Sequence, residues 1–229
     1  MITDQSPTAY QLVLGHRRLA IIDLSPAGHQ PMASANGTCW LVYNGEIYNY
    51  IELREELLQR GHSFSSDSDT EVILAAYRQW GPDCVRRFVG MFAFTLWDAI
   101  RRQLFCARGH FGIKPFYYHY DGRQFRFASE IKALLADPAL PRHVNERMAF
   151  DYLADGKLDH TADTFFAVIQ QLRPAQYLLL KLNEIEEHPP ARLTPRGYWD
   201  IQPDRCHPDW DDDQYARRLD HLLEDSVRL

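Results

Sequence analysis

The stretch MFAFTLWDAIRRQLFCARGHFGIKPFYYHYDGRQFRFAS, residues 91–129, contains four short segments that are rich in aromatic and β-branched residues. Such segments are typical of β-strands. The Asp121-Gly122 pair between the last two is a strong signal for a tight hairpin, because both residues tolerate the positive φ that such a turn requires. The stretch therefore predicts an antiparallel meander, in which each strand pairs with its neighbour in the sequence.

On both sides of this stretch, helices and strands are expected in separate blocks. Apolar runs predict strands within 14–24, 38–43 and 175–182, and apolar residues at helical spacing predict helices at about 50–60, 69–80, 129–138 and 145–155. Gly61 and Gly81 close the first two helices. Blocks of this kind indicate an α+β layered fold and not a doubly wound α/β sheet.

The segment LVYNGEIYNYIELREELL, residues 41–58, carries an Asn-Gly pair that has no second strand after it. Leu53, Leu57 and Leu58 lie at helical spacing, and Asn49 and Glu52 are placed as an N-cap and its capping-box partner. We therefore expect a strand, an exposed turn at 44–46 and then a helix. A turn that makes no hairpin but presents an amide, a bare backbone N–H and a carboxylate needs another explanation.

Composition excludes several classes of partner. The net charge is −6 and the 25 basic residues are scattered, which argues against nucleic acid or an anionic membrane as a partner. No apolar run approaches the ~18 residues of a membrane span, and the first residues lack a signal peptide, so a cytoplasmic protein is expected. The four cysteines form no CxxC pair and the ten histidines no HExxH motif, so no metal site is expected. Cys39 and Cys106 lie in apolar runs and are interpreted as small buried residues.

The C-terminal part differs in character from the rest. Residues 183–210 contain five of the thirteen prolines and are interpreted as an extended linker. Residues 211–229 predict an amphipathic helix with an apolar face formed by Tyr215, Leu219, Leu222, Leu223 and Val227. We expect one domain over 1–182, a linker, and the first helix of a further domain; a helix that folds back onto the first domain is the alternative.

Three long stretches, GHRRLAIIDLSPAGHQPM (15–32), YNGEIYNYIELREELLQRGHSFSSDSDTEVILAAYRQWG (43–81) and the region 88–135, closely resemble the glutamine amidotransferase domain of glutamine-hydrolysing asparagine synthetases. QQLRPAQYLLL and YWDI extend the resemblance toward the linker. It implies an N-terminal-nucleophile hydrolase: a four-layer αββα sandwich of two antiparallel sheets between helical layers. It also implies the glutaminase half-reaction of asparagine synthesis, in which glutamine yields glutamate and ammonia.

The resemblance also assigns residues to this chemistry. Attack on an amide carbonyl places negative charge on its oxygen, which needs preorganised hydrogen-bond donors. Asn44 and Gly45 correspond to the family's oxyanion hole, which explains the Asn-Gly-Glu sequence. Glu46 and Asp69 correspond to the acids that bind the α-ammonium group of glutamine, and Arg18 to the arginine that binds its α-carboxylate.

Each of these assignments has a simpler structural explanation as an alternative. Asn44-Gly45 alone would suit a turn chosen for its backbone geometry. Asp69 is a candidate helix N-cap, a role that is compatible with ligand binding. Arg17 stands beside Arg18, and spacing alone does not decide which of the two binds.

The chain also departs from the family pattern. The family's nucleophile is an N-terminal cysteine, whereas this sequence begins Met1-Ile2 and has no cysteine before Cys39. Gly109 stands where the family has an acidic residue, and no SGGLDS-like ATP loop occurs. The expectation is a domain truncated at both ends that does not hydrolyse glutamine by itself. No cofactor is expected here, since ATP and Mg would belong to the synthetase domain.

The expected partners are L-glutamine and a synthetase domain or subunit that binds through residues 211–229, with a homodimer as another use of that helix. Two other functions stay open at this stage. One is a glutamine-binding pseudoenzyme or interaction module without catalysis. The other is an amidotransferase domain that serves a different acceptor, such as a sugar phosphate or a glycan.

Overall fold

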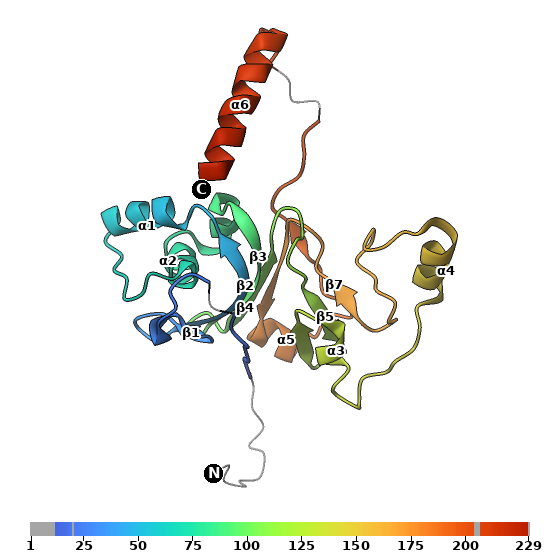
Figure 1. Ribbon diagram of the computed structural model, residues 1–229. Helices are drawn as coiled ribbons and strands as arrows, with labels where there is room; N and C mark the ends of the chain where they lie inside the picture. Colours follow the sequence, from blue (N-terminus) through green and yellow to red (C-terminus); the bar gives the residue numbers. More distant parts are fainter. Residues whose placement is uncertain (1–11, 20, 204–206, 229) are drawn as a thin grey trace.

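The computed structural model describes residues 12–19, 21–203 and 207–228, and its body is built on two antiparallel sheets (Figure 1). The larger sheet has the order β1-β2-β3-β4-β8-β9 and the smaller sheet the order β6-β5-β7. The strands are β1 (Met32–Ala33), β2 (Cys39–Ile47), β3 (Gly90–Asp98), β4 (Gln103–Arg108), β5 (Tyr117–Tyr120), β6 (Phe125–Ala128), β7 (Gln170–Gln171), β8 (Gln176–Lys181) and β9 (Arg196–Gly197).

Helices lie on the outer faces of both sheets. The helical elements are η1 (Pro26–Gly28), α1 (Tyr50–Gln59), α2 (Asp69–Trp80), η2 (Gly81–Arg87), α3 (Ile131–Leu134), α4 (Glu146–Asp155), α5 (Leu182–Glu187) and α6 (Asp212–Arg228). Figure 1 shows α1 and α2 on the side of the larger sheet, and α3 on the side of the smaller one. The layers therefore run helix, sheet, sheet, helix.

Three apolar cores fill the spaces between these layers. Strand β3 illustrates how alternation assigns its side chains: Phe94 packs toward α1 and α2, while Ala93 packs toward the smaller sheet. In the smaller sheet Tyr118 faces β4 and β8, and Tyr117 contacts the third core together with Leu134 of α3. The α+β class and the four-layer arrangement are confirmed.

The local signals for helices and hairpins are largely confirmed. Helices α1 and α2 end at Gln59 and Trp80, next to Gly61 and Gly81, and β5 and β6 form a hairpin around Asp121-Gly122. The four strands of the opening stretch do not form a single meander, however. β3 and β4 pair in the larger sheet, whereas β5 and β6 belong to the smaller one. The chain changes sheets between Arg108 and Tyr117.

The prediction of an exposed turn at 44–46 is wrong. These residues continue β2 and pair with β3, with Asn44 opposite Ala93, Gly45 opposite Phe92 and Glu46 opposite Met91. Gly45 has φ 155°, and a Cβ there would lie 2.2 Å from the Met91 carbonyl oxygen. The missing side chain of Gly45 therefore allows two paired strands to approach closely, and the glycine does not form a tight turn.

Two further predictions near this strand are also wrong. The described residues between 14 and 24 form no strand, and Leu19, Ile21 and Leu24 are exposed, because this apolar run pairs with no strand of either sheet. Asn49 occupies the N-cap position of α1, but its side chain does not cap the helix. It binds instead the Arg87 carbonyl and the Val89 N–H, at 2.9 Å each, and so ties α1 to the start of β3.

The C-terminal region contains structure where its composition indicated an extended linker. Helix α5 follows β8 directly, and β9 pairs with β8, because the edge of β8 offers unpaired backbone groups. Tyr198 is 2% exposed. The division into a domain over 1–182, a linker and a further domain stays a prediction.

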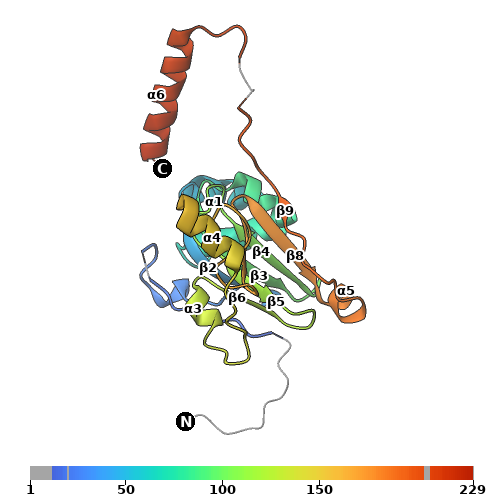
Figure 2. The same cartoon turned by 90° about the vertical axis from the view of Figure 1, so that its right-hand side faces the viewer.

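The predicted C-terminal helix is present as α6. A reciprocal capping box begins it, in which Gln214 N–H donates to the Asp211 carboxylate and Asp211 N–H donates to the Gln214 side chain. All residues of α6 are exposed, and Figures 1 and 2 show the helix standing apart from the sheets. Within the described residues, no helix combines the length and apolar character needed to cross a bilayer.

Candidate active site

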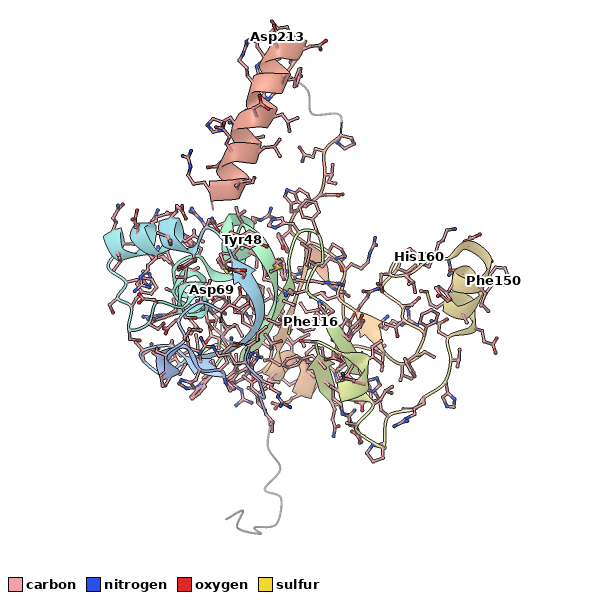
Figure 3. All side chains as sticks on the ribbon, viewed as in Figure 1. Tyr48, Asp69, Phe116, Phe150, His160 and Asp213 are labelled. Atoms are coloured by element: carbon pink, nitrogen blue, oxygen red, sulfur yellow. The ribbon has the colours of Figure 1, made fainter. Side chains whose placement is uncertain are left out.

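A cavity of about 580 Å³ lies beside β2 and reaches from the start of α2 to the smaller sheet. Figure 3 shows two of its lining residues, Asp69 on the helical side and Phe116 on the side of the smaller sheet. All five residues that the sequence singled out border this one cavity: Arg18, Asn44, Gly45, Glu46 and Asp69. They come from three segments separated by more than twenty residues each, so the fold brings them together.

The edge of β2 explains why the cavity can reach both faces of the sheet. Strand β1 pairs with Trp40 and Leu41 only. Beyond them, the Tyr43 N–H donates to the Gln30 side-chain oxygen at 2.6 Å, and not to a neighbouring strand. Asn44, Gly45 and Glu46 follow directly on this edge and are half-buried. A small ligand can therefore approach the polar groups of β2 from its side.

Asp69 is the first residue of α2 and is only 5% exposed. Its Oδ2 atom accepts hydrogen bonds from the Tyr43 hydroxyl at 2.7 Å and from the Ile47 N–H at 3.0 Å. Burial raises the pKa of the carboxyl above its ordinary value, and these hydrogen bonds act in the opposite direction. The N-cap of α2 is Ser68, whose hydroxyl accepts from the Thr70 N–H, so capping does not account for Asp69.

Arg18 is half-buried and its guanidinium binds backbone carbonyl groups of the segment that follows it. It donates to Ile22 at 2.9 Å, to Ser25 at 3.2 Å, and also to Asp23. Gly28 lies against the same group, since a Cβ there would meet Nη2 at 2.3 Å. Arg18 therefore shapes this wall of the cavity besides lending it positive charge. Arg17 borders the cavity as well and is exposed.

The sequence analysis did not identify several of the residues that line the cavity. Tyr43 looked like an ordinary core residue of a strand, and only the fold reveals its contact with Asp69. The far wall is formed by residues of the smaller sheet and its flanks, whose distance from β2 in the sequence conceals their role: Lys114, Phe116, Phe127, Ser129, Glu130 and Lys132. No local pattern marks these residues as neighbours of Asn44.

The cysteines of the described chain lie away from the cavity. Cys39, Cys84 and Cys106 are buried, as the apolar runs predicted for the first and third, and none of them borders the cavity. Burial raises the pKa of all three thiols, that of Cys106 to about 12. Cys206 falls outside the described residues. Within those residues no group of three or more His, Cys, Asp or Glu side chains could hold a metal ion.

Comparison with known families agrees with this geometry. Residues 4–191 match the family described as "Glutamine amidotransferase domain", which is most of the chain. The chain belongs to this family.

Individual relatives are similar over nearly the whole chain. Asparagine synthetase [glutamine-hydrolyzing] 3 of Bacillus subtilis is 38% identical over 220 residues, 95% of this chain and 34% of that protein. Putative asparagine synthetase [glutamine-hydrolyzing] 2 of Methanocaldococcus jannaschii is 35% identical over 236 residues, 96% of this chain and 44% of that protein. Amidase chry2 of Gibberella zeae is 35% identical over 218 residues, 94% of this chain and 31% of that protein. The chain thus spans less than half the length of these relatives.

Proposed function

We propose that the cavity beside β2 binds L-glutamine for release of its side-chain amide as ammonia. The observation that carries this proposal is the convergence of Arg18, Asn44, Gly45, Glu46 and Asp69 on a single cavity. Glutamine carries a carboxylate and an ammonium group at one end and an amide at the other. The residues around the cavity offer a guanidinium, two carboxylates and amide donors, which suit these groups one by one.

The charges favour a defined orientation of the ligand. Asp69 and Glu46 would pair with the α-ammonium group, and Arg18 with the α-carboxylate. Because Asp69 is buried, its interaction with a cation is screened less than that of a surface carboxylate. The amide end would then lie toward Asn44 and Gly45 on the edge of β2.

Asn44 and Gly45 would stabilise the oxyanion that forms when a nucleophile attacks the amide carbon. Loss of one such donor costs about 3–4 kcal/mol of activation free energy in well-studied enzymes. The resemblance noted above implies an N-terminal cysteine as the nucleophile. Since Cys39, Cys84 and Cys106 lie away from the cavity, hydrolysis would require a thiol from outside the described residues.

The whole protein's reaction is a further part of the proposal. Two of the relatives described above are named as glutamine-hydrolysing asparagine synthetases, one of them putative, which favours ammonia transfer to an ATP- and Mg-dependent synthetase domain in the cytoplasm. Helix α6, with its exposed apolar face, would connect to that domain or mediate a homodimer. The similarity to an amidase supports a second candidate, in which the same glutamine site serves a different acceptor.

Titration calorimetry with L-glutamine tests the site. We expect the wild-type chain to bind, and Asp69→Asn to weaken binding by about 2 kcal/mol or more, roughly 30-fold in Kd, because it leaves the α-ammonium group without its charged partner. Arg18→Lys should also weaken binding, because an ammonium group cannot hold the α-carboxylate through two parallel hydrogen bonds as a guanidinium can. Arg17→Lys is the matched control and should leave Kd unchanged. A wild-type chain that does not bind glutamine contradicts the proposal.

An ammonia-release assay on the same protein separates an amidotransferase from a binding module. The proposal predicts no release by the chain alone, and release after a segment that begins with cysteine is joined in front of residue 14. A Cys→Ala change in the joined segment should abolish the activity. Ammonia release at an enzyme-like rate by the unaltered chain would mean that another residue is the nucleophile.

A further inference from the structure

Tyr43 contacts the candidate glutamine site from the core side of β2. It lies on β2 next to Asn44, but its side chain points toward the core under α2 and is only 4% exposed. Its hydroxyl donates a 2.7 Å hydrogen bond to Asp69 Oδ2. The aromatic ring is thus part of the core, while the hydroxyl contacts a carboxylate that borders the cavity.

This contact helps to hold the Asp69 carboxylate in place. The hydroxyl of Tyr43 and the backbone N–H of Ile47, four residues further along β2, both donate to Oδ2. Two donors therefore hold the carboxylate at Oδ2, which fixes the orientation of the group beside the cavity. A phenylalanine would fill the core equally well, so packing alone does not require the hydroxyl.

The contact also affects the charge of Asp69. Burial raises the pKa of the Tyr43 phenol well above its ordinary value, and the nearby Asp69 adds to this effect, so the group stays a donor at all ordinary pH values. Its hydrogen bond stabilises the carboxylate form of Asp69, whose pKa burial would otherwise raise further. Glu46 and Tyr48 also act on the Tyr43 phenol. The other titratable groups that border the cavity are His16, Arg17, Arg18, Lys114, Glu130 and Lys132.

We propose that Tyr43 is a positioning residue for glutamine recognition: its hydroxyl holds in place the Asp69 carboxylate that receives the α-ammonium group. The inference rests on the proposed function, because it assigns Asp69 the same ligand group. It goes further in giving Tyr43, whose hydroxyl donates to Asp69, a share in selecting an amino acid with a free α-amine.

The test compares glutamine binding by the wild type and Tyr43→Phe from about pH 4.5 to 7.5. We expect Kd to rise about tenfold for Tyr43→Phe at neutral pH, since a hydrogen bond to a charged group is lost. As the pH is lowered, we also expect binding by Tyr43→Phe to weaken at a higher pH than binding by the wild type. Without the Tyr43 donor, the Asp69 carboxylate is protonated at a higher pH. The ligand's own ionisation is the same in both titrations and cancels.

Tyr77→Phe is the matched control. Tyr77 is equally buried, and its hydroxyl donates at 3.1 Å to the buried Asp98, but neither residue borders the cavity. This change should affect unfolding as Tyr43→Phe does, without moving the pH dependence of glutamine binding. In an Asp69→Asn background, Tyr43→Phe should have no further effect on Kd.

A Tyr43→Phe chain with the wild-type Kd and pH profile overturns the inference and leaves the proposed function standing. So does an equal shift in the Tyr77→Phe control, since the effect would then be one of general stability. A wild type that binds no glutamine overturns the proposed function, and with it the ligand assigned here. The pKa of Asp69, measured by NMR in the ligand-free wild type and Tyr43→Phe, then decides separately whether the Tyr43 hydroxyl stabilises the ionised form of Asp69.

Discussion

The hydroxyl of Tyr198 donates a 2.9 Å hydrogen bond to the backbone carbonyl of Arg108. The contact joins the segment after β9 to the end of β4, ninety residues earlier in the chain. The Tyr198 ring packs against His110 with centroids 5.2 Å apart, and the Arg86 side chain binds the Tyr198 carbonyl at 2.5 Å. Tyr198 is therefore packed against the end of β4 and the residues that follow it.

Tyr198 should accordingly contribute to stability. We expect Tyr198→Phe to lower the free energy of unfolding by about 1 kcal/mol, the net value of one hydrogen bond. Tyr198→Ala should lower it by about 3–5 kcal/mol, because a large buried ring is removed. Urea denaturation measures both. If Tyr198→Ala were as stable as the wild type, this segment would not be part of the core.

Gly45 should not tolerate a side chain. In Gly45→Ala the new Cβ would meet the Met91 carbonyl, so β2 and β3 would have to separate at the point where they border the cavity. We expect a loss of about 1–3 kcal/mol in unfolding free energy, together with weaker glutamine binding. Gly197→Ala, which has open space around it, is the control for the alanine itself. An unchanged Gly45→Ala variant would contradict the close approach.

Asp98 should make stability depend on pH. Burial opposes its ionisation, but hydrogen bonds from Arg101 and Tyr77 outweigh this and lower the carboxyl pKa. A lowered folded-state pKa means that the stabilisation is present above the ordinary Asp value of about 3.9 and is lost as the pH falls further. Asp98→Asn should therefore cost about 2 kcal/mol at pH 7 and less near pH 3. Chemical denaturation at both pH values checks this, and a constant difference would refute it.

Helix α6 should be dispensable for the stability of the rest. All its residues are exposed, so a chain that ends at Pro203 should unfold within ~2 °C of the full chain. The full chain should self-associate through the apolar face of α6, and the shortened chain should be monomeric by light scattering. Leu219→Glu together with Leu223→Glu tests the face without a deletion. If all three proteins have the same oligomeric state, this face does not mediate association.

The sequence by itself determined the elements that depend on neighbouring residues. The aromatic and β-branched residues within 91–98 predict β3, since such side chains favour strands. Asp121-Gly122 predicts the hairpin between β5 and β6, and the glycines after α1 and α2 mark where these helices end. The five candidate site residues were also found from the sequence, through its resemblance to a family.

Only the tertiary structure decided what depends on contacts between distant residues. Asn44-Gly45 has the local preference of a turn, but hydrogen bonds to β3 extend β2 through it, and a pair of strands outweighs the preference of two residues. The apolar run within 14–24 has the local preference of a strand, but its described residues pair with no strand. The donor from Tyr43 to Asp69 arises because α2 packs on β2, which brings together side chains twenty-six positions apart. Spacing in the sequence carries no record of such a contact, since it follows from how the layers stack.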